Sequence, residues 1–167
     1  TGGTIGMLAD PRTGALQPMD LAHLEEQVPE LDRINVKLGS YSFETPIDSS
    51  DMRPADWVRI ASIIGDHYDR YDGFVVLHGS DTMAYTASAL SFLLEGLNKP
   101  VILTGSQLPI GTIRTDAKEN LITAIEVAAA CNAQGQATVP EVAVYFEYSL
   151  YRGNRTVKVH AERFEAF

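Results

Sequence analysis

The sequence predicts an α/β fold with a mostly parallel sheet flanked by helices. Two continuous apolar runs, 73–77 and 100–104, are typical of strands buried in a parallel sheet. Segments with the helical spacing of apolar residues alternate with them, and this alternation favours strand–helix–strand units. With 167 residues, 45% of them hydrophobic, the chain can bury the core of one domain, 1–167.

Turn and cap residues set the order of elements in the first half. Gly- and Pro-containing segments predict exposed turns, Asp20 is a typical N-cap, and Pro54 suits the first turn of a helix. Alternating apolar and polar residues predict a strand between those two helices. The expected elements are, in order, an opening turn at 1–6, a loop at 8–18 that can move, a helix at 21–28, a strand at 34–38 and a helix at 54–68.

Buried strands and helices alternate in the second half. Gly96 is expected to end one helix, and Thr115 or Asp116 to begin the next. The expected elements are, in order, a strand at 73–77, a helix at 82–94, a strand at 100–104, a loop at 105–114, a helix ending near 130, a candidate linker at 132–140 and a strand at 142–146. This order predicts three layers of the Rossmann or flavodoxin-like kind.

Charge indicates which classes of partner are unfavourable, and cysteine content indicates the redox compartment. A net charge of −9 would repel a phosphate backbone and an anionic membrane surface, so nucleic acid and membrane are not expected partners. The single cysteine, Cys131, lies in an apolar stretch and is interpreted as a small core residue, which fits a reducing compartment. No run approaches the roughly 20 apolar residues of a membrane span.

Both ends of the sequence indicate a longer protein. A Gly-Gly turn normally follows a strand, so we expect several residues ahead of Thr1. The segment 157–167 stops without a polar tail or a helix stop signal. The domain is therefore expected to be truncated at both ends.

Hydroxyl side chains follow the predicted strand ends. Thr4, Ser80 and Ser106 each come directly after a glycine, and the carboxyl ends of parallel strands meet at one edge of a sheet. This edge is predicted to bind a small polar molecule. Glycine–threonine turns are common in any α/β protein, however, so catalysis by Thr4 does not follow from the turn alone.

Histidines and basic residues have plainer interpretations. His78 stands beside Ser80 and Asp81, but no G-x-S-x-G elbow is present, and we interpret His78 as structural. The remaining histidines lack partners at metal-binding spacing, and packing or solvent-facing roles are expected for them. The remaining histidines are His23, His67 and His160. Lys158 and Arg155 fit a solvated edge as well as they fit a functional site.

Four segments, 1–7, 78–90, 104–107 and 151–156, carry a more specific signal. Together, and in this order, they resemble the amino-terminal domain of bacterial type I (cytoplasmic) L-asparaginases. The resemblance implies hydrolysis of L-asparagine to L-aspartate and ammonia, with no metal or organic cofactor. It also implies a cytoplasmic homo-oligomer, a dimer or tetramer, and a smaller carboxyl-terminal domain beyond this chain.

The resemblance assigns roles to individual residues. Thr4 would be the nucleophile that forms a β-aspartyl ester. Ser80 and Asp81 match the family's second catalytic hydroxyl and the aspartate that holds the substrate's α-ammonium group. Lys158 matches the lysine that works with that pair as a proton acceptor.

The remaining assignments concern the substrate and the oxyanion. Ser49 and Ser50 fall where the family binds the α-carboxylate and the amino group, and the carbonyl of Ser106 would face the leaving amide nitrogen. Backbone N–H groups around Thr4 and Ser80 are the candidate oxyanion donors. Two positions depart from the family: Ser80 replaces a threonine, and the loop 12–18 lacks the tyrosine that orients the nucleophile.

Two alternatives stay open. A non-catalytic α/β module that binds a small ligand, such as a phosphate or nucleotide at Gly2 and Gly3, would lack the P-loop lysine–serine pair and a third glycine. The same core as the amidase subunit of a transfer-RNA amidotransferase would need a basic partner surface. The preference between L-asparagine and L-glutamine does not follow from the sequence.

Overall fold

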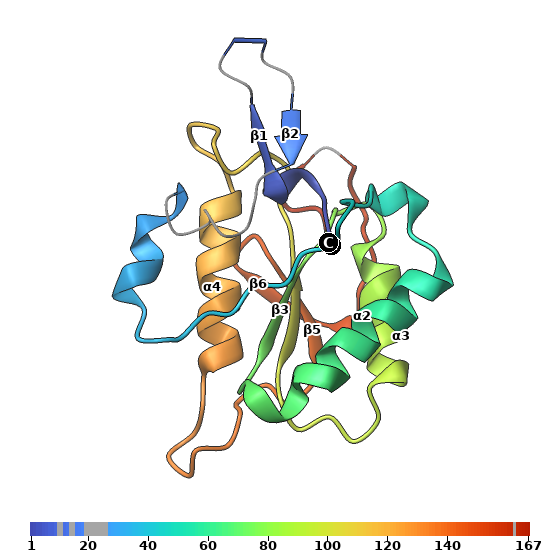
Figure 1. Cartoon of the computed structure of the whole chain (residues 1–167), viewed down its shortest axis with the longest axis vertical. Coiled ribbons are helices and arrows are strands. Elements are labelled where there is room, and N and C mark those ends of the chain that lie inside the picture. The colour runs from blue at the N-terminus through green and yellow to red at the C-terminus, as the bar shows by residue number, and fades with distance from the viewer. Residues whose placement is uncertain (10–11, 14–15, 19–26, 162) are drawn as a thin grey trace.

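The computed structural model describes the chain except residues 10–11, 14–15, 19–26 and 162, and it shows the predicted three layers (Figure 1). The described part contains a four-stranded sheet in the order β3-β4-β5-β6. Three strands are parallel, and β6 runs antiparallel to β5. The strands are β3 (Phe74–Leu77), β4 (Val101–Thr104), β5 (Val142–Phe146) and β6 (Ser149–Arg152).

Helices cover both faces of this sheet. Figure 1 shows α4 (Ala117–Ala129) on one side and α2 (Pro54–His67) with α3 (Met83–Leu93) on the other. Side chains of β4 alternate between the faces, so Leu103 packs in the cluster that includes α2 and α3, and Ile102 packs against α4. All four residues of β4 are buried for this reason.

Shorter elements complete the described chain. A two-stranded hairpin, β1 (Met7–Ala9) with β2 (Leu16–Pro18), projects from one end of the molecule (Figure 1). Single turns of 3-10 helix lie at Thr4–Gly6, Pro29–Arg33, Ser49–Asp51, Tyr68–Arg70 and Gly153–Arg155. None of the described helices has the length and apolar character that a membrane crossing requires.

Most of the predicted regular elements are confirmed. The helices α2, α3 and α4 and the strands β3, β4 and β5 all lie where they were expected, within a few residues. The left-handed conformation of Gly96, with φ of 67°, follows the end of α3 as predicted. The predicted helix at 21–28 lies almost wholly outside the described residues.

Three predictions are wrong, and one strand was not predicted. The predicted strand at 34–38 is an extended segment without a strand partner, and the predicted loop at 8–18 contains β1 and β2. Strand β6 was not expected, because its turn at Glu147 and Tyr148 lacks the usual glycine or asparagine although both residues have positive φ. Cys131 is exposed, because α4 ends at Ala129 and the cysteine lies beyond the covered helix.

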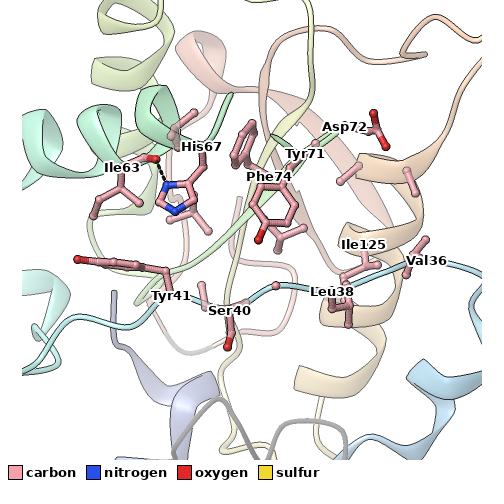
Figure 2. A pocket seen from close by; sticks show the side chains of 18 of the residues that line it. Val36, Leu38, Ser40, Tyr41, Ile63, His67, Tyr71, Asp72, Phe74 and Ile125 are labelled. Atoms are coloured by element: carbon pink, nitrogen blue, oxygen red, sulfur yellow. Dashed lines mark hydrogen bonds between the residues drawn. The ribbon is translucent and has the colours of Figure 1, made fainter. Parts of the chain in front are cut away.

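An apolar groove of about 840 Å³ runs along the edge of β3 that faces away from β4 (Figure 2). Ile63 and His67 of α2 and Ile125 of α4 line its two sides, and the extended segment at 35–41 forms its outer wall. Thr1 lies at this edge, with its hydroxyl donating to the Leu77 carbonyl at 2.7 Å. None of the predicted site residues lines the groove.

His78 is a buried polar residue at the end of β3. Its side chain is fully shielded from solvent, and the ring nitrogens bond to the Gly79 carbonyl at 2.7 Å and to the Thr86 hydroxyl at 2.8 Å. Burial lowers the pKa of His78 to about 4, against an ordinary value of 6.5. The folded protein therefore holds this imidazole neutral.

The neutral His78 makes stability depend on pH. The unfolded chain takes up a proton at His78 near pH 6.5, whereas the folded chain takes it up only near pH 4, so stability is lost as the pH falls between these values. Between pH 7 and pH 5, the free energy of unfolding should fall by about 2 kcal/mol more in the wild type than in His78→Gln. Denaturant titrations of both proteins measure the difference. An equal fall in the two proteins would show that His78 is not held neutral by the fold.

Candidate active site

The opening turn and the Ser49 turn meet the carboxyl ends of β3 and β4, and glycines allow the four segments to touch. A Cβ atom added to Gly3 would overlap the backbone of Gly79, and one added to Gly105 would overlap the His78 carbonyl. Gly79 in turn packs against the side chain of Ser49. The opening turn, the Ser49 turn and the ends of two strands are therefore in van der Waals contact.

Lys158, Ser80 and Asp81 form a polar cluster at this edge. The Lys158 Nζ donates to Ser80 Oγ at 2.9 Å and to Asp81 Oδ1 at 2.7 Å. The lysine side chain is 11% exposed, whereas that of Asp81 is 67% exposed. The cation thus lies inside and the anion outside, where a solvent-borne molecule can reach it.

Strand β6 and the turn after it bring Lys158 to this position. The chain leaves the sheet at Arg152, passes the 3-10 turn Gly153–Arg155, and places Lys158 near a pair 77 and 78 residues earlier in the sequence. Lys158 is therefore not a solvated edge residue. Arg155, the other candidate for that interpretation, is exposed.

The other predicted site residues lie on the surrounding turns. Thr4 is half-buried and begins the 3-10 turn after Gly3. Ser49 is buried, and its carbonyl accepts a hydrogen bond from the Thr82 hydroxyl at 2.6 Å. The Ser50 hydroxyl donates to Asp48 Oδ1 at 2.6 Å, and the buried Ser106 hydroxyl donates to the Leu108 carbonyl at 2.6 Å.

Gln107 contacts the Ser80 turn, although the sequence analysis gave it no role. Its Oε1 accepts a long hydrogen bond of 3.5 Å from Ser80 Oγ, and its Nε2 donates to the carbonyl of Arg163 at 2.8 Å and that of Ala161 at 3.3 Å. The glutamine therefore joins the Ser80 turn to the segment that follows Lys158. Only its place directly after Ser106 could have drawn attention to it.

Asp116 and Asn120 hold the loop that carries Gln107. Asp116 accepts from the backbone N–H groups of Gln107 at 2.8 Å and Leu108 at 3.0 Å, instead of capping α4 with its side chain. The Asn120 amide donates to the Gly105 carbonyl at 3.0 Å. Both side chains are buried, so the loop after β4 is fixed by groups inside the molecule.

The geometry excludes a Ser-His-Asp triad built from neighbouring residues. The ring nitrogens of His78 are engaged by Gly79 and Thr86, and the neighbour of Ser80 and Asp81 is Lys158. In the part of the chain that the structure describes, no three His, Cys, Asp or Glu side chains gather as a metal site would need.

Known proteins resemble this chain over its whole length. L-asparaginase 1 of Escherichia coli K12 is 49% identical over 100% of this chain and 48% of its own length. The crystal structure of L-asparaginase I from Vibrio cholerae superposes with a TM-score of 0.82 at 45% identity, over 97% of this chain and 47% of that one.

Relatives with other names share the same region. The 60 kDa lysophospholipase of Mus musculus is 44% identical over 100% of this chain and 32% of its own length. A glutamyl-tRNA(Gln) amidotransferase component from Methanopyrus kandleri is 40% identical over 100% of this chain and 37% of its own length. The chain thus spans half or less of each of these relatives.

The family follows from a match along the entire sequence. The family model described as "Asparaginase, N-terminal" matches residues 1–167, which confirms the resemblance found in the four segments. The chain belongs to the asparaginase family and corresponds to its N-terminal region.

Proposed function

We propose that the full-length protein hydrolyses L-asparagine to L-aspartate and ammonia, with Thr4 as the nucleophile. The observation that carries this proposal is the cluster of Lys158, Ser80 and Asp81 beside the turn that presents Thr4. A hydroxyl, a carboxylate and a largely shielded amine in contact provide a proton relay and an ammonium-binding group within one small site.

Different groups of the proposed site would bind the positive and the negative group of the substrate. The exposed carboxylate of Asp81 faces solvent and would receive the α-ammonium group of the substrate. Ser49 and Ser50, on the turn packed against Gly79, would bind the α-carboxylate. The side-chain amide would then extend toward Thr4, and the carbonyl of Ser106 would accept from its nitrogen.

The reaction would proceed through an ester. Thr4 Oγ attacks the side-chain amide carbon, and its proton passes through the Ser80 hydroxyl to Lys158, which must be in the neutral amine form at this step to accept it. Backbone N–H groups near Thr4 and Ser80 would stabilise the oxyanion. The carbon–nitrogen bond then breaks, and the nitrogen takes the proton from Lys158 and leaves as ammonia. Water attacks the β-aspartyl ester, which releases L-aspartate and restores the Thr4 hydroxyl.

The two rival functions predict different measurements. An amidotransferase subunit would bind transfer RNA, which a net charge of −9 opposes. A non-catalytic module would bind a nucleotide or phosphate and release no ammonia. An ammonia assay with L-asparagine and L-glutamine, run beside transfer-RNA and nucleotide binding, separates all three.

The cellular setting is also a proposal. A free, exposed cysteine fits the reducing cytoplasm, where thiols persist unpaired. We further expect a homo-oligomer, because Tyr85 and Phe92 on α3 are 66% and 71% exposed and large exposed aromatic groups favour association. A monomer in sedimentation velocity at assay concentration would contradict this expectation.

The groove along β3 supports the expectation that a strand precedes Thr1 in a longer protein. The backbone N–H groups of Phe74 and His78 donate to β4 and its flanking residue. Backbone groups of successive strand residues point to opposite sides, so the N–H and carbonyl of Val75 point away from β4 and into the groove. The groove is lined by apolar side chains from α2 and α4, as a further buried strand requires. We propose that the residues ahead of Thr1 run through it parallel to β3.

Replacing the nucleophile should abolish turnover. In the full-length protein, Thr4→Ala should release no measurable ammonia from L-asparagine while still binding it, because only the covalent step is lost. Calorimetric titration measures the binding. Thr138→Ala, at an exposed position, is the matched control and should keep wild-type activity. Activity of Thr4→Ala within tenfold of wild type would remove Thr4 from this role.

Removing the amine of Lys158 should slow the chemical step. Lys158→Met keeps the aliphatic stem and deletes the group that contacts Ser80 and Asp81, so kcat should fall by about 100-fold, as for the loss of a general base. Lys118→Met on α4 makes the same exchange away from the site and should leave kcat unchanged. A normal kcat for Lys158→Met would contradict the assignment.

Hydrogen exchange of the longer protein tests the strand in the groove. The amide of Val75 should exchange as slowly as that of His78, which already donates to Thr104 at 2.9 Å in the sheet. Mass spectrometry with electron-transfer fragmentation resolves the two amides. Fast exchange at Val75 beside slow exchange at His78 would show that the groove edge of β3 has no strand partner.

A further inference from the structure

Three side chains under the Ser80 turn form a continuous line of hydrogen bonds. Trp57 of α2 lies 2.9 Å from the Thr86 hydroxyl, Thr86 of α3 lies 2.8 Å from His78 Nε2, and His78 Nδ1 lies 2.7 Å from the Gly79 carbonyl. Thr86 and His78 are completely buried. The line crosses α2, α3 and the end of β3, and it ends at the peptide that joins Gly79 to Ser80.

The chemistry of each partner fixes the direction of every proton in this line. A carbonyl only accepts, so His78 Nδ1 must carry the proton that it gives to Gly79. In the neutral ring, Nε2 is then an acceptor and receives the hydroxyl proton of Thr86. The indole N–H of Trp57 can only donate, and it donates to the oxygen of the same Thr86 hydroxyl. Every group satisfies its neighbour with no proton left over.

The end of the line orients the peptide that joins Gly79 to Ser80. Because glycine has few conformational restrictions, Gly79 by itself would let this peptide rotate. Rotation becomes costly when the Gly79 carbonyl is held by a fixed hydrogen-bond partner. His78 provides that partner from inside the molecule. The side chain of Ser80 follows this peptide, and its hydroxyl lies 2.9 Å from Lys158 Nζ. Rotation of the peptide would therefore move the hydroxyl away from Lys158.

We propose that Trp57, Thr86 and His78 form a hydrogen-bonded line that orients the Gly79–Ser80 peptide and thereby places the Ser80 hydroxyl on Lys158. In this proposal His78 is a positioning residue, held as the Nδ1–H tautomer, and transfers no proton to substrate. The proposal rests on the proposed amidohydrolase function for its effect on rate. Its effect on the tautomer is independent of that function.

The test removes one hydroxyl and restores it in a matched variant. In the full-length protein, Thr86→Val keeps the side-chain shape and deletes the donor to His78, whereas Thr86→Ser keeps the donor. A displacement of about 1 Å at a reacting group costs up to roughly 100-fold in rate. We therefore expect kcat of Thr86→Val to fall about tenfold or more, with KM nearly unchanged, and Thr86→Ser to recover most of it.

Two controls separate positioning from general loss of structure. Thr123→Val makes the same exchange on α4, where the hydroxyl donates only to Glu119, and kcat should not change. Rates are expressed per folded molecule and measured well below the melting temperature of each variant. Wild-type kcat in Thr86→Val, or an equal fall in Thr86→Ser and Thr86→Val, would overturn the proposal and leave the amidohydrolase function standing.

Nitrogen NMR of the imidazole decides the tautomer without any turnover. Wild-type protein at pH 7 should show His78 protonated at Nδ1 alone, and Thr86→Val should alter the Nε2 resonance. A wild-type His78 protonated at Nε2, or at both nitrogens, would overturn the proposal. If the wild type released no ammonia from L-asparagine, the proposed function would fail, and with it the predicted effect on rate.

Discussion

The close contact of backbones at the His78–Gly79 peptide is the constraint on which the site depends. Gly3, Gly79 and Gly105 each occupy a place where a Cβ atom would collide with neighbouring atoms. Each of these glycines is followed directly by a hydroxyl residue, Thr4, Ser80 or Ser106 in turn. Packing of the glycines therefore also gathers three hydroxyl residues around one small region, and any side chain at a glycine would separate them.

Interior polar groups hold this region in place. Asp116 and Asn120 fix the loop after β4 from α4, and Gln107 connects that loop to the segment carrying Lys158. Trp57 and Thr86 reach the same region from α2 and α3. Helices on both faces of the sheet thus contribute buried hydrogen bonds, and such bonds are costly to leave unsatisfied.

The spacing of apolar residues and the cap residues were enough to predict most helices and the buried strands. The helices α2, α3 and α4 and the buried strands β3, β4 and β5 follow from the apolar spacing and from cap residues. The alternation at 34–38 suggested a strand, but a strand needs a neighbour, and pairing is not encoded in alternation. Strand β6 escaped prediction because Glu147 and Tyr148 adopt a turn conformation that they rarely favour.

The site could be predicted only in part. Glycine and hydroxyl residues at strand ends pointed to the edge of the sheet where Lys158, Ser80 and Asp81 meet, whereas the assignment of Lys158 came from family resemblance. No spacing rule relates Lys158 to Ser80 and Asp81, which lie almost 80 residues earlier. Trp57 and Thr86 look like ordinary helix residues in the sequence, and only the packing of α2 on α3 reveals their polar contact.

The two outer strands of the sheet differ in a way that affects how this chain behaves in isolation. At β6, Arg152 pairs with Glu141 at 2.7 Å, and charged groups of this kind discourage another chain from adding to the edge. At β3, the edge that has no strand partner among the described residues faces an apolar groove instead. Within the described residues the backbone of Val75 therefore has no strand partner on this side, and a strand from another chain could pair with it in place of the proposed one.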